Sequence, residues 1–324
     1  MNILSSIKAN HLKELKEFEN FFGNILKTDH ILIKHITNLV LRRKGKLIRP
    51  LLVILSAKLI DKPNKKTIIG ASLVELIHTA TLVHDDVVDN SNLRRNFFSI
   101  KALWHSKVAV LYGDYLLAKG LLLSVENNFF DLLEISSKAV KKMIEGELLQ
   151  FKKSRRVEYT KMDYYKIIES KTASLMAVAC QIGGKSVYAS KEQSNILYEF
   201  GRMIGIIFQI KDDILDIEAN SKTGKTKAND IIENKITLPL ILALEIASKK
   251  EKRLIFSILQ KKNKSIKDIK KITKFIIEKN GINNAYKILE EYKRKSLNLL
   301  KKFDDNVARK DLINLINFIS QRNY

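Results

Sequence analysis

The stretch Leu82-Val83-His84-Asp85-Asp86-Val87-Val88-Asp89 places three acidic residues at the end of an apolar segment. On a helix, residues four apart lie one above the other, so Asp85 and Asp89 share a face and Asp86 lies beside them. Like charges at this spacing repel each other, and more strongly when they are partly buried. Carboxylates on one face suit Mg²⁺, which takes oxygen ligands and commonly shares its shell with substrate phosphates. The stretch therefore predicts a helix that ends in a magnesium site.

A second copy of the pattern lies at Asp212-Asp213-Ile214-Leu215-Asp216, again after an apolar segment. An isolated acid triplet is usually a solvated helix end. In both copies, however, apolar residues lie between the acids, which a solvated end does not require. The pair of clusters therefore favours metal binding over two solvated helix ends.

The composition predicts long helices. Only 3 prolines and 12 glycines interrupt 324 residues, and the hydrophobic share of 45% is enough for a sizeable core. The scarcity of turn residues and a composition rich in Leu, Ile, Lys and Glu favour an all-α protein. We expect one domain over residues 1–324. Within it, apolar periodicity predicts helices over 51–60, 68–89, 103–125, 129–151, 164–182, 190–216 and 237–247, with a loop over 94–99.

The charge is strongly basic, with 58 Lys and Arg against 35 Asp and Glu, a formal net charge of +23. Such an excess is compatible with nucleic acid, with anionic lipid, with a polyanionic small molecule or with a solvated surface. The lysines spread through 249–310 without the interleaved aromatics of single-stranded nucleic-acid grooves. This pattern favours a solvated surface and no nucleic-acid partner.

The sequence also predicts a cytoplasmic location. Cys180 is the only cysteine, so a disulfide framework is excluded. Residues 1–19 lack the continuous apolar core of a signal peptide, and no run of 18 apolar residues exists. We therefore expect a soluble protein in a reducing compartment.

The acid clusters and their surroundings resemble the two aspartate-rich regions of the trans-type polyprenyl diphosphate synthases. The resemblance rests on His78 with the first cluster and Arg94-Arg95, and on Phe208-Gln209-Ile210-Lys211 before the second. Further motifs follow in the family's order: Gly45-Lys46-x-x-Arg49-Pro50, Gly113-Asp114, Glu145-Gly146-Glu147, Lys171-Thr172, Gly224-Lys225 and Thr237-Leu238-Pro239. The likeness is greatest to long-chain bacterial members of the octaprenyl type. It implies the isoprenoid synthase fold, with helices bundled around a deep central cavity.

The resemblance also implies the reaction. Members transfer an allylic prenyl group onto isopentenyl diphosphate, and here would elongate farnesyl diphosphate repeatedly to a long all-trans polyprenyl diphosphate for a quinone side chain. Mg²⁺, about three ions per active site, would neutralise the diphosphate leaving group. We expect a homodimer, as in the relatives, and a peripheral contact with anionic lipid through which the product is released.

Residue roles carry over motif by motif. The implied metal ligands are Asp85, Asp86, Asp89, Asp212, Asp213 and Asp216. The groups implied for isopentenyl diphosphate are Gly45, Lys46, Arg49, His78 and Arg95. The groups implied for the allylic diphosphate are Arg94, Lys171, Thr172, Gln209, Lys225 and Lys235. Asp85, Asp89, Asp212 and Lys171 are the expected catalytic residues, whereas Glu145 and Glu147 are not expected to bind metal.

Several positions depart from the family pattern, and none of them is a presumed metal ligand. Lys44, Asn96 and Ala228 replace glycines, Leu47 a basic residue, Lys101 an asparagine and Ile236 a proline. Lys46 and Arg49 remain, so we expect the phosphate contact there to be kept.

Product length is expected to depend on Ala80 and Thr81, about one helical turn before Asp85. A bulky aromatic there would form a floor, whereas Ala and Thr leave a path for a product of about C40. Val83, Leu116 and Leu117 remain candidates for a deeper floor. The alternatives are a short-chain farnesyl or geranylgeranyl synthase, which should carry bulk at these positions, a terpene cyclase, which should lack the second Asp-rich pattern, and a non-catalytic subunit of a heteromeric synthase.

Overall fold

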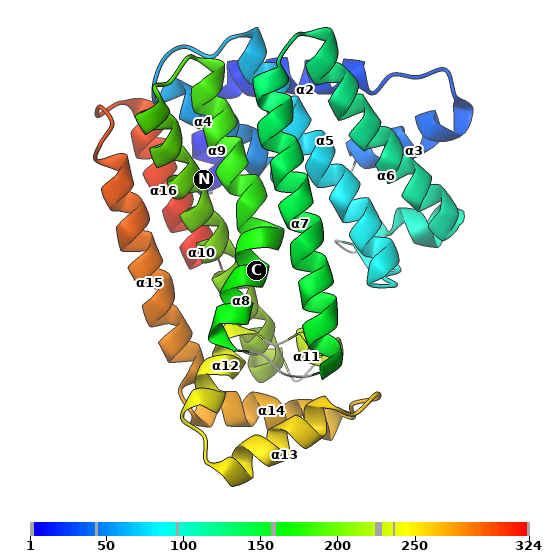
Figure 1. Ribbon diagram of the computed structural model, residues 1–324, viewed down its shortest axis with the longest axis vertical. Coiled ribbons are helices and arrows are strands. Elements are labelled where there is room, and N and C mark those ends of the chain that lie inside the picture. The colour runs from blue at the N-terminus through cyan, green and yellow to red at the C-terminus, as the bar shows by residue number, and fades with distance from the viewer. Residues whose placement is uncertain are drawn as a thin grey trace. The chain divides into compact units, whose positions relative to one another are not determined.

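The computed structural model describes residues 3–42, 45–94, 97–156, 160–223, 229–235 and 237–322. Figure 1 shows them as a set of helices. The helices of the first part of the chain are α1 (Ile3–Asn10), α2 (Leu12–Ile25), α3 (Ile31–Arg42), α4 (Ile48–Lys58), α5 (Lys65–Val88), α6 (Ile100–Glu126) and α7 (Phe130–Arg156). Those of the second part are α8 (Lys161–Ile168), the π-helix η1 (Glu169–Ala173), α9 (Ser174–Ser186), α10 (Lys191–Thr223), α11 (Asn229–Ile232), α12 (Leu238–Glu245), α13 (Lys249–Leu259), α14 (Ile266–Glu278), α15 (Gly281–Leu300) and α16 (Val307–Gln321).

The chain divides into two compact units. Unit 1 comprises residues 1–140, 178–198 and 303–312, and unit 2 comprises residues 141–177, 199–302 and 313–324. The expectation of a single domain over 1–324 stays a prediction.

The core of unit 1 is built on α5, which lies against α2, α4 and α6. Figure 1 shows α5 and α6 side by side, in cyan and teal. The start of α5 is fixed by Asn64, whose side chain accepts a hydrogen bond from the Thr67 N–H while the Thr67 hydroxyl accepts one from the Asn64 N–H. This reciprocal cap satisfies two backbone donors that a helix start leaves open. Its residues then bury an apolar face along most of the helix, down to Val83.

The segment before α6 differs from the predicted loop. Within 94–99, β2 (Phe97–Phe98) pairs antiparallel with β1 (Leu93–Arg94), a two-residue ladder. Ser99 then caps α6, because its hydroxyl accepts a hydrogen bond from the Ala102 N–H. Inside the first turns of α6, His105 has φ 70° and ψ 163°, so the helix bends there.

Unit 2 contains the larger departure from the predicted helices. The helix expected over 164–182 is interrupted by η1, so that α8, η1 and α9 follow one another without a loop. Elsewhere in this unit α12 lies against α8, α14 and α15, and α14 lies against α15. The capping residues Thr160, Ser248 and Ser265 start α8, α13 and α14, each paired with an acid three residues later.

Candidate active site

The first acid cluster lies in the last turn of α5. Asp85 is half-buried, Asp86 is buried at 5% exposure, and Asp89 is exposed at the position that caps the helix. The Asp89 N–H donates to the Asp85 carbonyl at 2.8 Å, so the two residues are one turn apart on the same face, as predicted. Two of the three acids are therefore within reach of an ion from solvent.

The motif Gly113-Asp114 explains why α6 approaches this turn so closely. A Cβ at position 113 would overlap the imidazole of His84, the residue before the cluster. The His84 Nε2 lies 3.1 Å from the Val110 carbonyl oxygen and 3.3 Å from Asp114 Oδ1. Gly113 therefore makes room for a side chain that fastens the acidic end of α5 to α6.

Two residues predicted for isopentenyl diphosphate are brought together between α4 and α5. Arg49 Nη1 donates to His78 Nε2 at 2.8 Å, and both side chains are half-buried. Lys46 is exposed just before α4. Leu47, the position that departs from the family pattern, has φ 50°, a left-handed conformation that is uncommon without glycine. Arg95 lies outside the described residues, as does Lys44, and of Arg94 only the backbone is described.

The second acid cluster lies on α10, and its middle acid is enclosed. Asp213 Oδ2 accepts hydrogen bonds from the Tyr164 hydroxyl at 2.7 Å and from the Leu238 N–H at 3.0 Å. Its Oδ1 accepts one from Gln209 Nε2 at 3.0 Å. Burial, then the charge of Asp230, raises the pKa of Asp213 to about 7. Asp213 thus ties α8, α10 and the start of α12 together.

The first acid of this cluster has a cationic partner that the sequence did not indicate. Arg322 Nη2 donates to Asp212 Oδ1 at 2.7 Å, and 43% of the Asp212 side chain is exposed. Asp216 is half-buried one turn further along α10. No local motif marks Arg322, because it is 110 residues away from Asp212 in the chain.

The π-helix η1 carries Lys171 and Thr172, two of the predicted allylic-site residues. Lys171 Nζ lies 2.5 Å from Glu147 Oε2 on α7. A Cβ at Gly146 would lie 2.7 Å from the Ser170 Cβ, and one at Gly205 of α10 would overlap Ala173. Two glycines therefore let α7 and α10 approach η1 closely, and π-helical turns are frequent at functional sites.

Thr172 extends this arrangement to the acid cluster. Its hydroxyl donates to Gln209 Oε1 at 2.9 Å, and the amide of Gln209 in turn donates to Asp213. Three predicted site residues are thus linked in one hydrogen-bond chain. Glu147 contacts Lys171, a role compatible with the expectation that it does not bind metal, and no sequence motif marks Tyr164 as the partner of Asp213.

The remaining predicted allylic residues are Lys225 and Lys235. Lys225 lies outside the described residues, with Gly224, Ala228 and Ile236. Lys235 Nζ lies 2.6 Å from Glu233 Oε2. Burial raises the pKa of the nearby Asp230 to about 6, although Lys235 opposes this shift.

The donor chemistry of both clusters fits a hard divalent cation. Asp85, Asp89 and Asp212 present carboxylate oxygens with at least partial exposure, and Asp212 is paired with Arg322. Within the described ranges, no group of three or more His, Cys, Asp or Glu side chains is close enough to enclose a metal by itself. Mg²⁺ needs only one or two carboxylates when water and phosphate oxygens complete its shell. Asp85 and Asp89 belong to unit 1 and Asp212 to unit 2, and their approach across one cavity stays a prediction.

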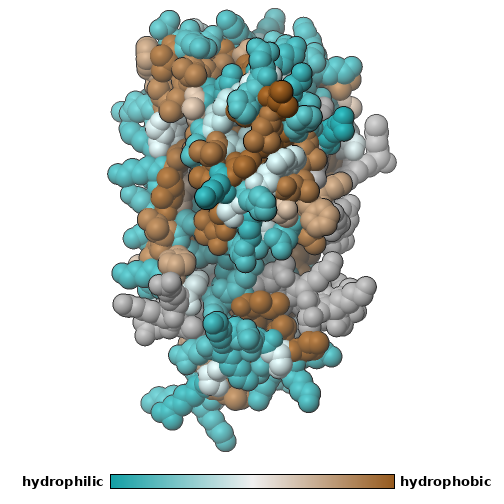
Figure 2. Space-filling view, turned by 90° about the vertical axis from the view of Figure 1, so that its right-hand side faces the viewer, coloured by the Kyte–Doolittle hydropathy of each residue, from teal (hydrophilic) through white to brown (hydrophobic). Residues whose placement is uncertain are grey.

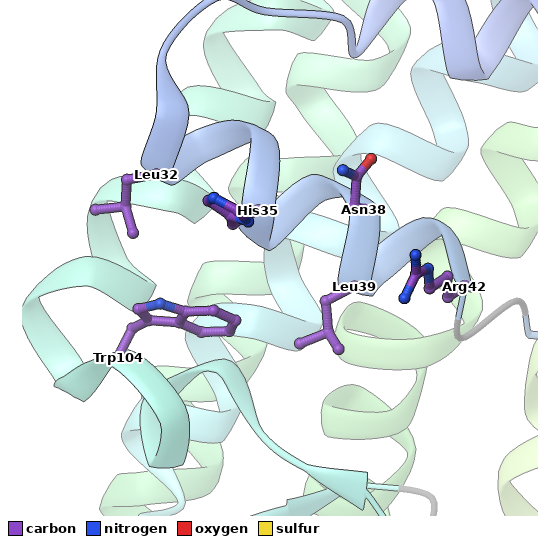
Figure 3. A pocket seen from close by; sticks show the side chains of 6 residues that line it. All are labelled: Leu32, His35, Asn38, Leu39, Arg42 and Trp104. Carbon is purple, nitrogen blue, oxygen red and sulfur yellow. The ribbon is translucent and has the colours of Figure 1, made fainter.

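A separate pocket of about 300 Å³ lies between α3 and the start of α6 (Figure 3). Figure 3 shows Leu32 and Leu39 on the side of α3 that faces the Trp104 indole. The lining residues are Leu32, His35, Asn38, Leu39, Arg42 and Trp104. None of them is a predicted site residue.

Comparisons with known proteins place this site in a family. The sequence model described as Polyprenyl synthetase matches residues 30–276. The octaprenyl diphosphate synthase of Haemophilus influenzae is 30% identical over 300 residues, covering 92% of this chain and 91% of that protein. The geranylgeranyl diphosphate synthase of Saccharolobus solfataricus is 31% identical over 323 residues, covering 96% and 97%.

A solved structure agrees with these relatives. The polyprenyl synthase of Caulobacter crescentus CB15, complexed with calcium and isoprenyl diphosphate, superposes with a TM-score of 0.91 at 30% identity, covering 99% of this chain and 98% of that one. The predicted all-α class is confirmed, and the family's dependence on a divalent metal agrees with the calcium in that complex. The family model covers more than half of the chain, so the protein belongs to the polyprenyl synthetase family and is a prenyltransferase, a prenyl diphosphate synthase with the isoprenoid synthase fold.

Proposed function

We propose that this prenyltransferase elongates farnesyl diphosphate with successive isopentenyl diphosphate units to an all-trans product of about C40, for the side chain of a quinone. The observation that carries the length is the small size of Ala80 and Thr81 below Asp85 on α5. The Thr81 hydroxyl donates to the His78 carbonyl at 2.9 Å, so its polar group is already satisfied within the helix. The side of α5 that leads away from the acids therefore offers no bulky floor at these two positions.

The basic residues of unit 1 suit isopentenyl diphosphate. Arg49 is always protonated, and its contact with His78 Nε2 orients the guanidinium between α4 and α5. A guanidinium can bind a phosphate through two parallel hydrogen bonds, and exposed Lys46 adds a point charge. These residues bind and orient the diphosphate of the nucleophilic substrate.

The residues of unit 2 suit the allylic diphosphate. Lys171 is held by Glu147, and Thr172 by Gln209, so both are oriented before the substrate arrives. Pre-organised donors stabilise charge that develops on a leaving group better than mobile ones do. We assign Lys171 to the stabilisation of the departing diphosphate.

About three Mg²⁺ ions, held by Asp85 and Asp89 with Asp86 in support and by Asp212 with Asp213 and Asp216 beside it, would supply Lewis-acid neutralisation of the diphosphate. Asp213 contributes through Tyr164 and Leu238, because its oxygens already accept their hydrogen bonds. Asp213 therefore fixes the position of the turn of α10 that carries Asp212.

The test incubates the purified protein with Mg²⁺, farnesyl diphosphate and labelled isopentenyl diphosphate, and then sizes the extracted product. A product near C40 is expected. A product that stops at C20, or farnesyl diphosphate left unextended at C15, would contradict the long-chain proposal and favour the short-chain alternative. Incorporation that requires an added partner chain would identify this protein as one subunit of a heteromeric synthase.

We also propose a homodimer, with α6 in the interface. Along its outer side, α6 exposes Leu111 at 68%, and also Leu103, Val110, Leu121, Leu122 and Val125. Figure 2 shows hydrophobic residues gathered over the part of the surface where Figure 1 places α3 and α6. The face is apolar along most of a 27-residue helix. In a twofold dimer each subunit contributes the same patch, so this face can pack against the identical face of a second copy. The pocket beside Trp104 lies next to this face and offers a second element for the partner copy to cover.

Sedimentation of the pure protein tests the dimer. Leu111→Lys together with Leu122→Lys should shift the protein to a monomer, whereas Lys252→Glu on α13 should not. A monomeric wild-type protein would contradict the proposal.

We further propose that the enzyme works in the cytoplasm and touches anionic lipid through exposed lysines. These lie on α13 and α14, among them Lys250, Lys267 and Lys271. By length and composition alone α5 and α6 are long and apolar enough to cross a membrane. In α5, however, 67% of the most apolar 18-residue stretch is buried inside the protein. Sedimentation with anionic liposomes should show binding that 0.5 M salt removes, and a lack of salt-sensitive binding would contradict the lipid contact.

A further inference from the structure

Arg322 follows the last turn of α16 and lies against α10. Its N–H donates to the Phe318 carbonyl at 3.1 Å, which continues the helical pattern. Its Nη2 donates to the Phe208 carbonyl at 2.9 Å and to Asp212 Oδ1 at 2.7 Å. The guanidinium carbon lies 4.0 Å from the centre of the Phe208 ring. The guanidinium is therefore fixed by three separate contacts to one turn of α10.

The pair is asymmetric in its exposure to solvent. The Arg322 side chain is 10% exposed and that of Asp212 is 43% exposed. A guanidinium that has lost most of its water needs a counter-charge, and Asp212 is the carboxylate that it contacts. Asp212 nevertheless remains open enough for a second cation to reach it from solvent.

A guanidinium and a divalent ion compete for the same negative charge. The guanidinium and the divalent ion each interact best with the full charge of the carboxylate. In a partly desolvated site the two cations also repel each other, so a nearby guanidinium weakens metal binding. The metal can therefore be held tightly at Asp212 only when the guanidinium no longer neutralises it.

We propose that Arg322 is a built-in competitor of the metal at Asp212: it neutralises this acid in the metal-free enzyme and is displaced when the ion binds. This inference rests on the proposed role of Asp212 as a metal ligand. Metal binding at Asp212 would in this way release the end of α16, because Arg322 directly follows this helix.

The test uses Mn²⁺ as the probe and measures free Mn²⁺ by electron paramagnetic resonance, without substrate. Arg322→Gln should bind Mn²⁺ about tenfold more tightly than the wild type, since it removes the competing charge and keeps a hydrogen-bond donor. Arg322→Lys keeps the charge and should stay near the wild type. Arg309→Gln is the matched control, because this arginine of α16 donates to the Phe303 carbonyl at 3.1 Å in unit 1.

Hydrogen exchange of the wild-type protein gives a second measurement that needs no variant. Mn²⁺ should speed the exchange of the amides at 320–322, because the side chain that fastens this end of the chain is released. Unchanged exchange, or unchanged or weaker Mn²⁺ binding by a folded Arg322→Gln variant, would overturn the inference.

Asp212→Asn separates this inference from the proposed function. If this variant binds as many Mn²⁺ ions as the wild type, Asp212 is not a metal ligand, and both proposals fail. If it binds fewer while Arg322→Gln leaves the affinity unchanged, only the competition fails.

Discussion

Adjacent acids in the second cluster have different environments. Asp212 is 43% exposed, whereas Asp213 is buried and accepts hydrogen bonds from Tyr164, Gln209 and Leu238. Successive helix positions point about 100° apart, so one acid reaches solvent while its neighbour enters the core. The first cluster divides in the same way, with Asp86 buried beside half-buried Asp85.

Removal of a metal ligand should cost far more activity than removal of a surface acid. Asp85→Asn and Asp212→Asn should each lower kcat about 10³-fold, because the metal contributes several kcal/mol of charge stabilisation. Asp131→Asn is the control, since that acid pairs with Lys66 at the surface. Steady-state incorporation of labelled isopentenyl diphosphate checks this, and full activity of either cluster variant would contradict the metal assignment.

His11 should make the folded state sensitive to acid. It is 1% exposed, and its Nε2 lies 2.8 Å from Asp311 Oδ2. Burial lowers the pKa of His11 below 6.5, although Asp311 opposes the shift. The unfolded chain therefore binds the proton first as the pH falls through 6.5, so this contribution to stability is full above that pH and is lost below it.

Urea unfolding at a series of pH values checks this expectation. The free energy of unfolding of the wild type should fall between pH 7.5 and pH 5.5, and His11→Gln should show a shallower fall. The exposed His30→Gln should behave as the wild type. Parallel curves for His11→Gln and the wild type would contradict the assignment.

At the scale of elements, η1 depends on two glycines in its neighbours. Gly146→Ala would place a Cβ 2.7 Å from the Ser170 Cβ and 3.2 Å from the Lys171 nitrogen. The overlap should cost about 1–3 kcal/mol of stability. It should also shift Lys171, and a displacement near 1 Å lowers kcat by about 100-fold.

Gly23→Ala on α2 is the matched control. Its Cβ would meet nothing within 4 Å, so this variant should gain about 0.4–1 kcal/mol of stability and keep its activity. Thermal unfolding and initial rates measure both variants. Wild-type activity in Gly146→Ala would show that the spacing between α7 and η1 does not position Lys171.

The helices were predictable because apolar periodicity is a local signal, and the predicted bounds of α4 and α5 agree with the structure to within three residues at each end. The π-helix was not predictable, since nothing in Glu169–Ala173 itself requires a wider turn. The residues that leave room for η1, Gly146 and Gly205, lie on other helices, so the segment's own sequence does not indicate it. The hairpin at β1 and β2 escaped for a similar reason, since two residues are too few to show alternation.

At the scale of the molecule, product length should respond to one position. Thr81→Phe should shorten the product toward C20, a single addition to farnesyl diphosphate, because the ring would fill the path below Asp85. Thr79→Phe is the control, since residues two apart on a helix point to nearly opposite sides. Chromatography of the extracted products measures this, and an unchanged length in Thr81→Phe would contradict the position of the path.

The candidate site was predictable where a motif holds the partners close in sequence or the resemblance matches them. Arg49 with His78, and Thr172 with Gln209, were assigned to common sites and do meet. Arg322 and Tyr164 were missed as partners of the acids, because only folding brings them there. A distant cation or hydroxyl leaves no pattern around the acid that it contacts.

The wide turn at η1 has a consequence for insertions and deletions. A π-helical turn contains one residue more than an α-helical turn, so the number of residues between α8 and α9 fixes which side of the chain presents Lys171. Removing one residue from Glu169–Ala173 would let the segment wind as an α-helix and leave α8 and α9 close to their present orientation, because the wide turn already absorbs the extra residue. A single missing codon in this segment should therefore spare the helices on both sides and act mainly on the turn itself, where it changes how Lys171 and Thr172 are presented.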